Sequence, residues 1–554
     1  MKSVPTLKLE ANLGPLYARS SIACTGDTQP HDADAVEEQS SLHLAVVKLR
    51  ALHQVSDDAL RAIGSTIAQL TTLGMLSIVV LEPVSGPSSS YASFTKDVSH
   101  HVSRVANALH LDGPGAIGKP RAQRVDQAFE VESNSHRVAG KLSRQYTRLS
   151  SVGKNLIYSL LQRDTMPIIS PMGVESTPEI RLIPVDVDEQ VVEIVKAFDG
   201  SKIRSLDYVN TSGQHLPRNK GSSKMIHVDR IIILDPRGGV PSPERNHAPH
   251  VYINLRQEHK DIEAQIKQYD EDILCRGAKI GHTRNLKLLG DTLDLLTDSS
   301  SGLIVTPEAV TSAWTQLEEY SGPQVRTRSK RNPLIHNLLT DKPSISSSLP
   351  YGRSSGLGFG GPTSTFVKRG MPLTTIPDVF KESWVPPSLA TKALRSLSDP
   401  EIDLEKLVRL IEASFKKKLD VNRFITRINE RFAGLVVAGD YEGCALFTWE
   451  ESSTAPGIFI PYLDKFAVQP PSQGTGMSVS DILFTCMIMD CFPNGVCWRS
   501  RSTNPVNKWY FERARGAWKL PGTIWTCFWT TDQPSRAELT AYESICRDIP
   551  PTFP

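Results

Sequence analysis

Short apolar runs alternate with stretches of helical periodicity over the first 300 residues, and this alternation limits the possible folds more than any other feature. Such an order favours a mostly parallel sheet with helices on both of its faces. We therefore predict one α/β domain over residues 41–345. The expected strands are 44–47, 76–81, 182–185, 230–234, 251–255 and 302–305, and the expected helices are 57–73, 260–269 and 286–296.

A stretch rich in serine, proline and glycine, residues 345–365, separates this pattern from a different one. Such a composition is typical of linkers and long loops. We place a linker at 346–371, a compact α+β domain at 372–540 and a tail at 541–554. Residues 1–40 are polar and aperiodic, which indicates a disordered leader. Their basic, acid-poor start also fits the remnant of an organelle transit peptide.

The second domain contains a recognisable order of helices and strands. Asp399-Pro400-Glu401 is typical of a helix start, with a capping side chain, a proline at the first helical position and an acid in the first turn. The expected helices are 404–415, 424–432, 477–489 and 508–513, and the expected strands are 435–437, 444–449, 457–460, 462–468, 497–501 and 524–528.

A glycine-containing loop, Gln473-Gly474-Thr475-Gly476-Met477, lies between the longest of these strands and an apolar helix. The first amides of a helix lack intrahelical partners, and the helix dipole adds positive charge there. Glycines let a phosphate approach this backbone closely. The loop alone would fit a plain turn, but its place in the order of elements predicts a pyrophosphate site.

Composition excludes several classes of function. Lys and Arg (62) nearly balance Asp and Glu (60), so nucleic acid is not an expected partner. No apolar run approaches the ~20 residues that cross a bilayer, so no membrane partner is expected. The eight cysteines form no C-x-x-C pair, which favours a reducing compartment. Neither cysteines nor histidines show zinc-ligand spacing, so no metal is expected.

The order of elements, with the glycine loop after the longest strand, resembles the GNAT acyltransferase fold. Five segments resemble, more closely, the vertebrate-like and fungal N-acetylglutamate synthases. They are Tyr462-Leu463-Asp464-Lys465-Phe466, Gln473-Gly474-Thr475-Gly476, Trp498-Arg499-Ser500-Arg501, Asn504-Pro505 and Trp509-Tyr510-Phe511-Glu512. The resemblance implies acetyl-CoA as co-substrate and a GNAT-type domain at the C-terminal side.

The first domain is similar to the amino-acid kinase domain of the same enzymes, which implies an αβα sandwich. Ile232–Pro236 with Gly238-Gly239, Tyr252–Leu255 and Leu303–Pro307 carry this similarity. Working acetylglutamate kinases have a Lys-Gly-Gly phosphate loop after the first strand, whereas Lys48-Leu49-Arg50 stands here. Because no glycine is present, the backbone cannot cradle phosphates in the same way. The expected role of this domain is regulatory and catalytically silent.

Cationic side chains are required to hold an acceptor with two carboxylates. Arg499 and Arg501 alternate along one strand and can bind carboxylates through paired hydrogen bonds. The resemblance implies that Lys417, Lys465, Arg499, Arg501 and Asn504 bind glutamate. Lys417 equally fits a basic helix end that complements the helix dipole.

The resemblance also implies catalytic and cofactor-binding residues. Tyr510 matches the tyrosine that protonates the departing thiolate in many GNAT enzymes, although a tyrosine of the core would have the same pattern. Asn504 and Tyr462 are further candidates near the reacting atoms. The backbone of Phe466, Ala467 and Val468 is expected to face the pantetheine, and the residues from Gln473 to Met477 are expected to hold the pyrophosphate.

The expected function is acetyl transfer from acetyl-CoA to the α-amino group of L-glutamate, the first step of arginine biosynthesis, with feedback inhibition by L-arginine. Two alternatives remain open: a non-catalytic arginine sensor that binds acetylglutamate kinase, and acetylglutamate kinase activity in the first domain. The resemblance further implies a location in the mitochondrial matrix and a homo-oligomer, with a tetramer as the expected form.

Overall fold

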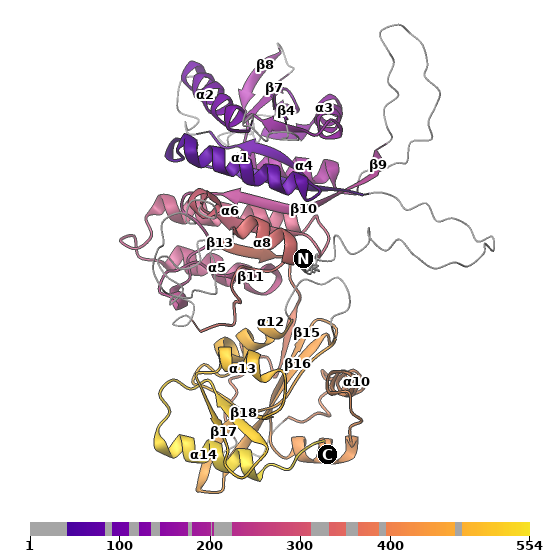
Figure 1. Ribbon diagram of the computed structural model, residues 1–554, viewed down its shortest axis with the longest axis vertical. Coiled ribbons are helices and arrows are strands. Elements are labelled where there is room, and N and C mark those ends of the chain that lie inside the picture. Colours follow the sequence, from indigo (N-terminus) through magenta and orange to yellow (C-terminus); the bar gives the residue numbers. More distant parts are fainter. Residues whose placement is uncertain are drawn as a thin grey trace, which may run out of the picture. The chain divides into compact units, whose positions relative to one another are not determined.

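The computed structural model consists of two compact units (Figure 1). The first comprises Met1–Ser344 and Pro362–Arg369, and the second comprises Ile345–Gly361 and Gly370–Pro554. The structure describes residues 41–83, 91–109, 121–133, 145–175, 180–200, 202–203, 224–311, 332–350, 364–386, 395–470 and 479–553.

A nine-stranded, mostly parallel sheet forms the centre of the first unit. Its order is β11-β13-β12-β10-β1-β2-β6-β3, and β9 pairs with β10. β13 is antiparallel to β12 and β9 is antiparallel to β10. The strands are β1 (Ser41–Leu49), β2 (Met75–Leu81), β3 (Arg121–Val125), β6 (Thr165–Ile169), β9 (Lys202–Ile203), β10 (Lys224–Leu234), β11 (Tyr252–Asn254), β12 (Ser301–Val305) and β13 (Ser364–Lys368).

Helices cover both faces of this sheet. The central strand β1 is therefore buried on both sides. Leu44 and Val46 face one hydrophobic cluster, and Ala45 and Val47 face the other. The first cluster includes α3 (Ser151–Gln162), α4 (Val187–Phe198), α5 (Leu255–Gln268) and α6 (Arg276–Leu293). The second includes α1 (Asp57–Thr72), α2 (Tyr91–Leu109), α7 (Pro307–Thr311) and α8 (Pro333–Thr340). This confirms the predicted αβα sandwich.

A smaller sheet of order β5-β4-β7-β8 lies apart from the main sheet. Its strands are β4 (Phe129–Ser133), β5 (Gln145–Leu149), β7 (Met172–Glu175) and β8 (Arg181–Pro184). The expected strand 182–185 therefore does not belong to the parallel sheet, which corrects that prediction. β8 pairs antiparallel with β7 and is only partly buried, as suits an edge strand.

The second unit is built on a seven-stranded sheet of order β14-β15-β16-β17-β18-β20-β19. Its strands are β14 (Leu373–Ile376), β15 (Phe432–Ala438), β16 (Gly443–Ser452), β17 (Ala455–Val468), β18 (Cys497–Arg501), β19 (Gly516–Lys519) and β20 (Trp525–Trp529). Its helices are α10 (Leu404–Phe415), α11 (Val421–Asn429), α12 (Val479–Cys486), α13 (Asn507–Arg513) and α14 (Arg536–Asp548), and a π turn at Met487–Cys491 follows α12. The fold is the predicted α+β type.

The sheet is split between the parallel strands β17 and β18. The two strands pair at Tyr462 and Cys497 alone, although β17 continues to Val468. On its other side β17 stays paired with β16 as far as Val468. The strand ends therefore separate after Tyr462, which leaves room between them at the level of Phe466. This splayed pair is where the sequence predicted the acetyl-CoA site.

Three further segments differ from the sequence-based expectations. The cap of α10 is Asp403, whose carboxylate accepts from the amide of Lys406, so the helix start predicted at Asp399 is wrong. Residues 364–368 were expected in the linker. They form β13, which pairs with β12 in the first unit's sheet, and all five residues are buried there. Residues 541–548, placed in the tail, complete α14, which carries a capping box at Ser535 and Glu538.

Candidate functional site

A cavity of about 780 Å³ lies in the second unit where β17 and β18 separate. It is lined by α10, α13, both strands and the segment that follows α14. Among the predicted site residues, it brings together Lys417, Tyr462, Lys465, Phe466, Val468, Arg499, Arg501, Asn504 and Tyr510. These residues are up to 93 positions apart in the sequence, as the numbers of Lys417 and Tyr510 show.

Of the other predicted site residues, one lies outside the cavity lining and five lie outside the described residues. Ala467 does not line the cavity; its side chain is fully buried in the opposite hydrophobic cluster, since neighbouring residues of a strand face opposite sides. The loop residues Gln473, Gly474, Thr475, Gly476 and Met477 lie outside the described residues. The cradle expected for the pyrophosphate therefore stays a prediction.

The charge of the cavity suits an anionic acceptor. Its lining contains four cations, Lys417, Lys465, Arg499 and Arg501, and one carboxylate, Asp464. Asp464 is already paired with Lys465 and with Arg427 of α11. Since that carboxylate is already paired within the protein, the cations of the lining outnumber the carboxylates that could pair with a ligand cation.

Lys465 is held in the cavity wall by an ion-pair network. Its ammonium contacts the Asp464 carboxylate at 2.5 Å and the Thr552 hydroxyl at 2.8 Å. Burial lowers the pKa of Lys465, and the charge of Asp464 opposes this effect. Arg427 binds Asp464 and also Glu450, at 2.9 Å. The network fixes the lysine where its charge faces the cavity.

Arg499 is preorganised by an aromatic ring and by a helix end. Its guanidinium carbon lies 4.1 Å from the ring centroid of Trp525. One of its terminal nitrogens donates to the carbonyl of Cys546, in the last turn of α14, at 2.6 Å. Arg501 lies 6.0 Å from the same Trp525 ring and donates to the carbonyl of Phe553 at 3.2 Å. Both arginines thus contact an aromatic ring and a backbone carbonyl beside the cavity.

Tyr510 sits in an aromatic cage beside the cavity. Its ring lies 5.4 Å from that of Trp498, 5.6 Å from that of Trp509 and 5.5 Å from that of Phe528. Burial raises the pKa of Tyr510, so the phenol is protonated at neutral pH. Tyr462 also lines the cavity, and burial raises its pKa as well. A protonated phenol at this place can donate a proton to a departing thiolate.

Asn504 follows β18 and has its side chain engaged locally. Its amide nitrogen donates to the Ser500 hydroxyl at 2.9 Å, and its amide oxygen accepts from the backbone of Val506 at 3.1 Å. This arrangement turns the chain from β18 into α13 and brings Tyr510 to the cavity. The geometry therefore also gives Asn504 a structural role.

Residues that the sequence did not single out complete the cavity. They are Trp525, Asp464, which pairs with Arg427 outside the lining, and the segment Ile549–Phe553. Proline cannot continue a helix, so Pro550-Pro551 after α14 could have indicated an extended segment. No local pattern indicates where that segment packs. Among the described residues no helix has the length and apolarity of a membrane span, and no three side chains gather as a metal site requires.

The end of β1 in the first unit carries a dense set of ion pairs. The buried Lys48 ammonium lies 3.0 Å from Glu82 and also binds Asp188. Arg50 contacts Glu82 at 2.6 Å and Asp235 at 3.3 Å. Burial alone would raise the pKa of Asp188, but the charges of Lys48 and Arg284 hold it below its ordinary value. Two cations are thus already matched by three carboxylates at this edge.

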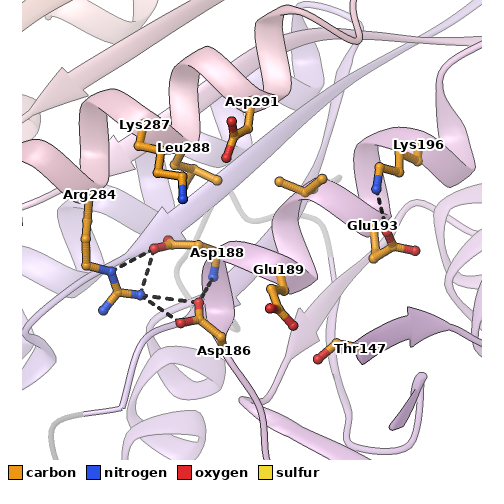
Figure 2. Close-up of a pocket in the computed structure, with 11 residues that line it drawn as sticks. Thr147, Asp186, Asp188, Glu189, Glu193, Lys196, Arg284, Lys287, Leu288 and Asp291 are labelled. Carbon is orange, nitrogen blue, oxygen red and sulfur yellow. Dashed lines mark hydrogen bonds and ion pairs between the residues drawn. The ribbon is translucent and has the colours of Figure 1, made fainter. Parts of the chain in front are cut away.

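A second cavity, of about 420 Å³, lies beside this edge between α4 and α6. Arg284 contacts Asp186 at 3.3 Å and Asp188 at 2.7 Å, and Lys196 contacts Glu193 at 2.9 Å (Figure 2). The lining contains five carboxylates and three cations, Asp186, Asp188, Glu189, Glu193, Asp291, Lys196, Arg284 and Lys287. Asp188 connects this cavity to Lys48.

The sheet of the second unit and its cationic cavity define a class of protein, the GNAT-type N-acetyltransferases. A family model described as the N-acetyltransferase of N-acetylglutamate synthase matches residues 391–548. A solved structure of N-acetylglutamate synthase from Neisseria gonorrhoeae, complexed with coenzyme A and L-arginine, aligns over 90% of this chain and 96% of its own, at 11% identity and a TM-score of 0.39.

Relatives with curated names identify the family. The mitochondrial amino-acid acetyltransferase of Ajellomyces capsulatus is 37% identical over 583 residues, which cover 93% of this chain and 82% of the relative. That of Aspergillus fumigatus is 35% identical over 623 residues, covering 100% and 83%. The chain belongs to this amino-acid acetyltransferase family. Membership confirms the predicted class of enzyme, an acyltransferase with acetyl-CoA as acetyl donor.

Proposed function

We propose that the chain transfers the acetyl group of acetyl-CoA to the α-amino group of L-glutamate, as the first step of arginine biosynthesis. One observation carries the choice of acceptor: Lys465, Arg499 and Arg501 line a single cavity together with Tyr510. An acceptor with two carboxylates can neutralise the excess positive charge there through charge-assisted hydrogen bonds. A neutral amino acid would leave part of that charge uncompensated.

The proposed reaction is a direct attack within a ternary complex. The glutamate ammonium loses a proton to solvent water, its nitrogen attacks the thioester carbonyl, and a tetrahedral intermediate with an oxyanion forms. When that intermediate collapses, the C–S bond breaks and the thiolate of CoA leaves. Tyr510 donates its phenolic proton to that thiolate; its raised pKa keeps the phenol protonated at neutral pH and makes the phenolate left behind basic enough to take up the second proton that the attacking nitrogen loses. We assign Tyr462 to orienting the acceptor or a water.

Substrate placement follows from the splayed strands. The separated edge of β17, at Phe466 and Val468, is proposed to receive the pantetheine of acetyl-CoA. The loop from Gln473 to Met477 is proposed to bind the pyrophosphate. Arg499 and Arg501 hold the acceptor carboxylates from β18, with Lys465 on the facing strand and Lys417 after α10.

Release of the CoA thiol tests the proposal. With purified protein and acetyl-CoA, a thiol reagent should report release that depends on L-glutamate and is far slower with L-glutamine or L-alanine. A folded preparation without glutamate-dependent release would favour the alternative function, an arginine-sensing partner of acetylglutamate kinase. The position of Tyr510 on the cavity favours the enzyme over that sensor.

We further propose that the first unit is a regulatory domain without kinase activity. The ion pairs of Lys48 and Arg50 support this, because a nucleotide phosphate would have to displace Glu82 and Asp188 from them. L-arginine is proposed to inhibit the enzyme, and the same thiol assay with added arginine checks this.

A mitochondrial matrix location agrees with the mitochondrial naming of the relatives. A homotetramer and an association with acetylglutamate kinase complete the proposal, and the measured mass in solution, alone and with that kinase, tests both.

A further inference from the structure

The segment after α14, Ile549–Phe553, forms one wall of the acceptor cavity; we name it the C-terminal strap. Ile549 ends α14 in an extended conformation, and Pro550-Pro551 keeps the chain extended because proline fixes φ. The Phe553 ring then lies 5.1 Å from that of Phe415, the last residue of α10. Both ends of the strap are therefore attached to secondary structure of the same unit.

The strap and the helix before it supply neutral acceptors to the cations of the cavity. Lys465 donates to the hydroxyl of Thr552 at 2.8 Å, Arg501 to the carbonyl of Phe553 at 3.2 Å and Arg499 to the carbonyl of Cys546 at 2.6 Å. Two of these acceptors are carbonyls, which have no proton to give. The Thr552 hydroxyl is different because a hydroxyl that accepts a hydrogen bond can also donate one.

The hydroxyl of Thr552 has its donor capacity left. It accepts from Lys465, and no described residue accepts a hydrogen bond from it. The residue is half-buried and lines the cavity. The Lys465 ammonium, itself bound to Asp464, polarises the hydroxyl and makes it a better donor. A hydroxyl donor pointed by a cation is suited to a carboxylate oxygen.

We propose that Thr552 is an acceptor-binding residue: its hydroxyl takes a hydrogen bond from Lys465 and donates one to a carboxylate of the amino-acid acceptor. This rests on the proposed function, which supplies the dicarboxylic acceptor. Lys465 then acts on the acceptor both through its charge and through Thr552. The C-terminal strap thus belongs to the acceptor site, where it adds a neutral donor beside the four cations.

Kinetics of Thr552→Val and Thr552→Ser test the assignment. Valine has the shape of threonine without the hydroxyl, so Thr552→Val should raise the KM for glutamate about 10-fold, the effect of ~1.4 kcal/mol lost from a hydrogen bond to a charged group. The kcat and the KM for acetyl-CoA should change less than about 2-fold, given that binding of the acceptor alone is affected. Thr552→Ser keeps the hydroxyl and should stay close to the unaltered enzyme.

Thr540→Val is the matched control, since Thr540 is an exposed residue of α14 whose hydroxyl donates to the Arg536 carbonyl. It should leave every constant unchanged. An unchanged KM for glutamate in Thr552→Val overturns the proposal, and a lowered KM overturns it by showing that the strap competes with the acceptor. Equal losses in Thr552→Val and Thr552→Ser would also overturn it. If the unaltered protein releases no thiol with glutamate, the proposed function fails instead.

Discussion

At the scale of single residues, the cations of the cavity differ in the groups that hold them. Lys465 is tied to the Asp464 carboxylate, whereas Arg499 is held by a ring and a carbonyl, which are neutral. An arginine supported by neutral groups keeps its full charge for a ligand. Arg499 is therefore better suited than Lys465 to direct contact with an acceptor carboxylate.

Replacing the proposed proton donor should separate chemistry from binding. We expect Tyr510→Phe to lower kcat by about 10²-fold or more, the usual effect of losing a general acid, with little change in the KM for glutamate. The ring remains, so its contacts with Trp498 and Phe528 are preserved. Initial-rate kinetics across pH give the answer. Full activity at every pH would remove Tyr510 from the mechanism.

The sequence predicted much of the cavity at this scale, and its failures have a physical cause. Arg499 and Arg501 are recognisable because a two-residue spacing on a strand places both side chains on one face. Trp525 lies on a distant strand, and Thr552 follows the last helix. Tertiary packing creates their contacts with Arg499 and Lys465, so no local spacing in the sequence could predict them. The loop from Gln473 to Met477 lies outside the described residues, so its role stays a prediction.

At the scale of helices and strands, the separation of β17 from β18 is the feature that creates the cavity. It turns two neighbouring strands into the walls of a cavity, and it depends on backbone pairing that apolar periodicity does not encode. Periodicity placed β1, α1, β2 and α10 within a few residues. It could not assign β8 to a separate sheet or β13 to the first unit, because sheet membership is decided by long-range pairing.

Helix α6 should make the first unit sensitive to acid. Burial, with the nearby charges of Arg237 and Arg50, lowers the pKa of His282 to about 4. Between that value and the ordinary 6.5 the unfolded chain binds a proton that the folded chain does not, so stability falls as pH falls. From pH 7 to pH 5 this costs about 2 kcal/mol.

The pH dependence of urea unfolding measures this effect. The first unit's transition should move to lower urea at pH 5, and in His282→Gln the difference between pH 7 and pH 5 should shrink by about that amount. The comparison uses each protein as its own reference, so a general loss of stability in the variant does not affect it. An identical difference in both proteins would exclude His282 as its source.

At the scale of the whole molecule, we expect only one of the two units to carry out chemistry. With radioactive ATP, magnesium and N-acetylglutamate, the protein should transfer no phosphoryl group, because Lys48 and Arg50 are occupied by Glu82, Asp188 and Asp235. The same preparation must release thiol with glutamate, which shows that it is folded and active. Measurable phosphorylation would contradict the regulatory role of the first unit.

The position of β13 has a practical consequence for anyone who wishes to express one unit alone. The chain passes between the units three times, at 344–345, 361–362 and 369–370. A recombinant second unit that begins at 370 lacks Ser346 and Ser348, which bind Arg513 at 2.9 and 2.6 Å. One that begins at 345 carries β13 without β11 and β12, a buried strand with both edges exposed and therefore prone to aggregate. A clean excision requires joining 345–361 directly to 370.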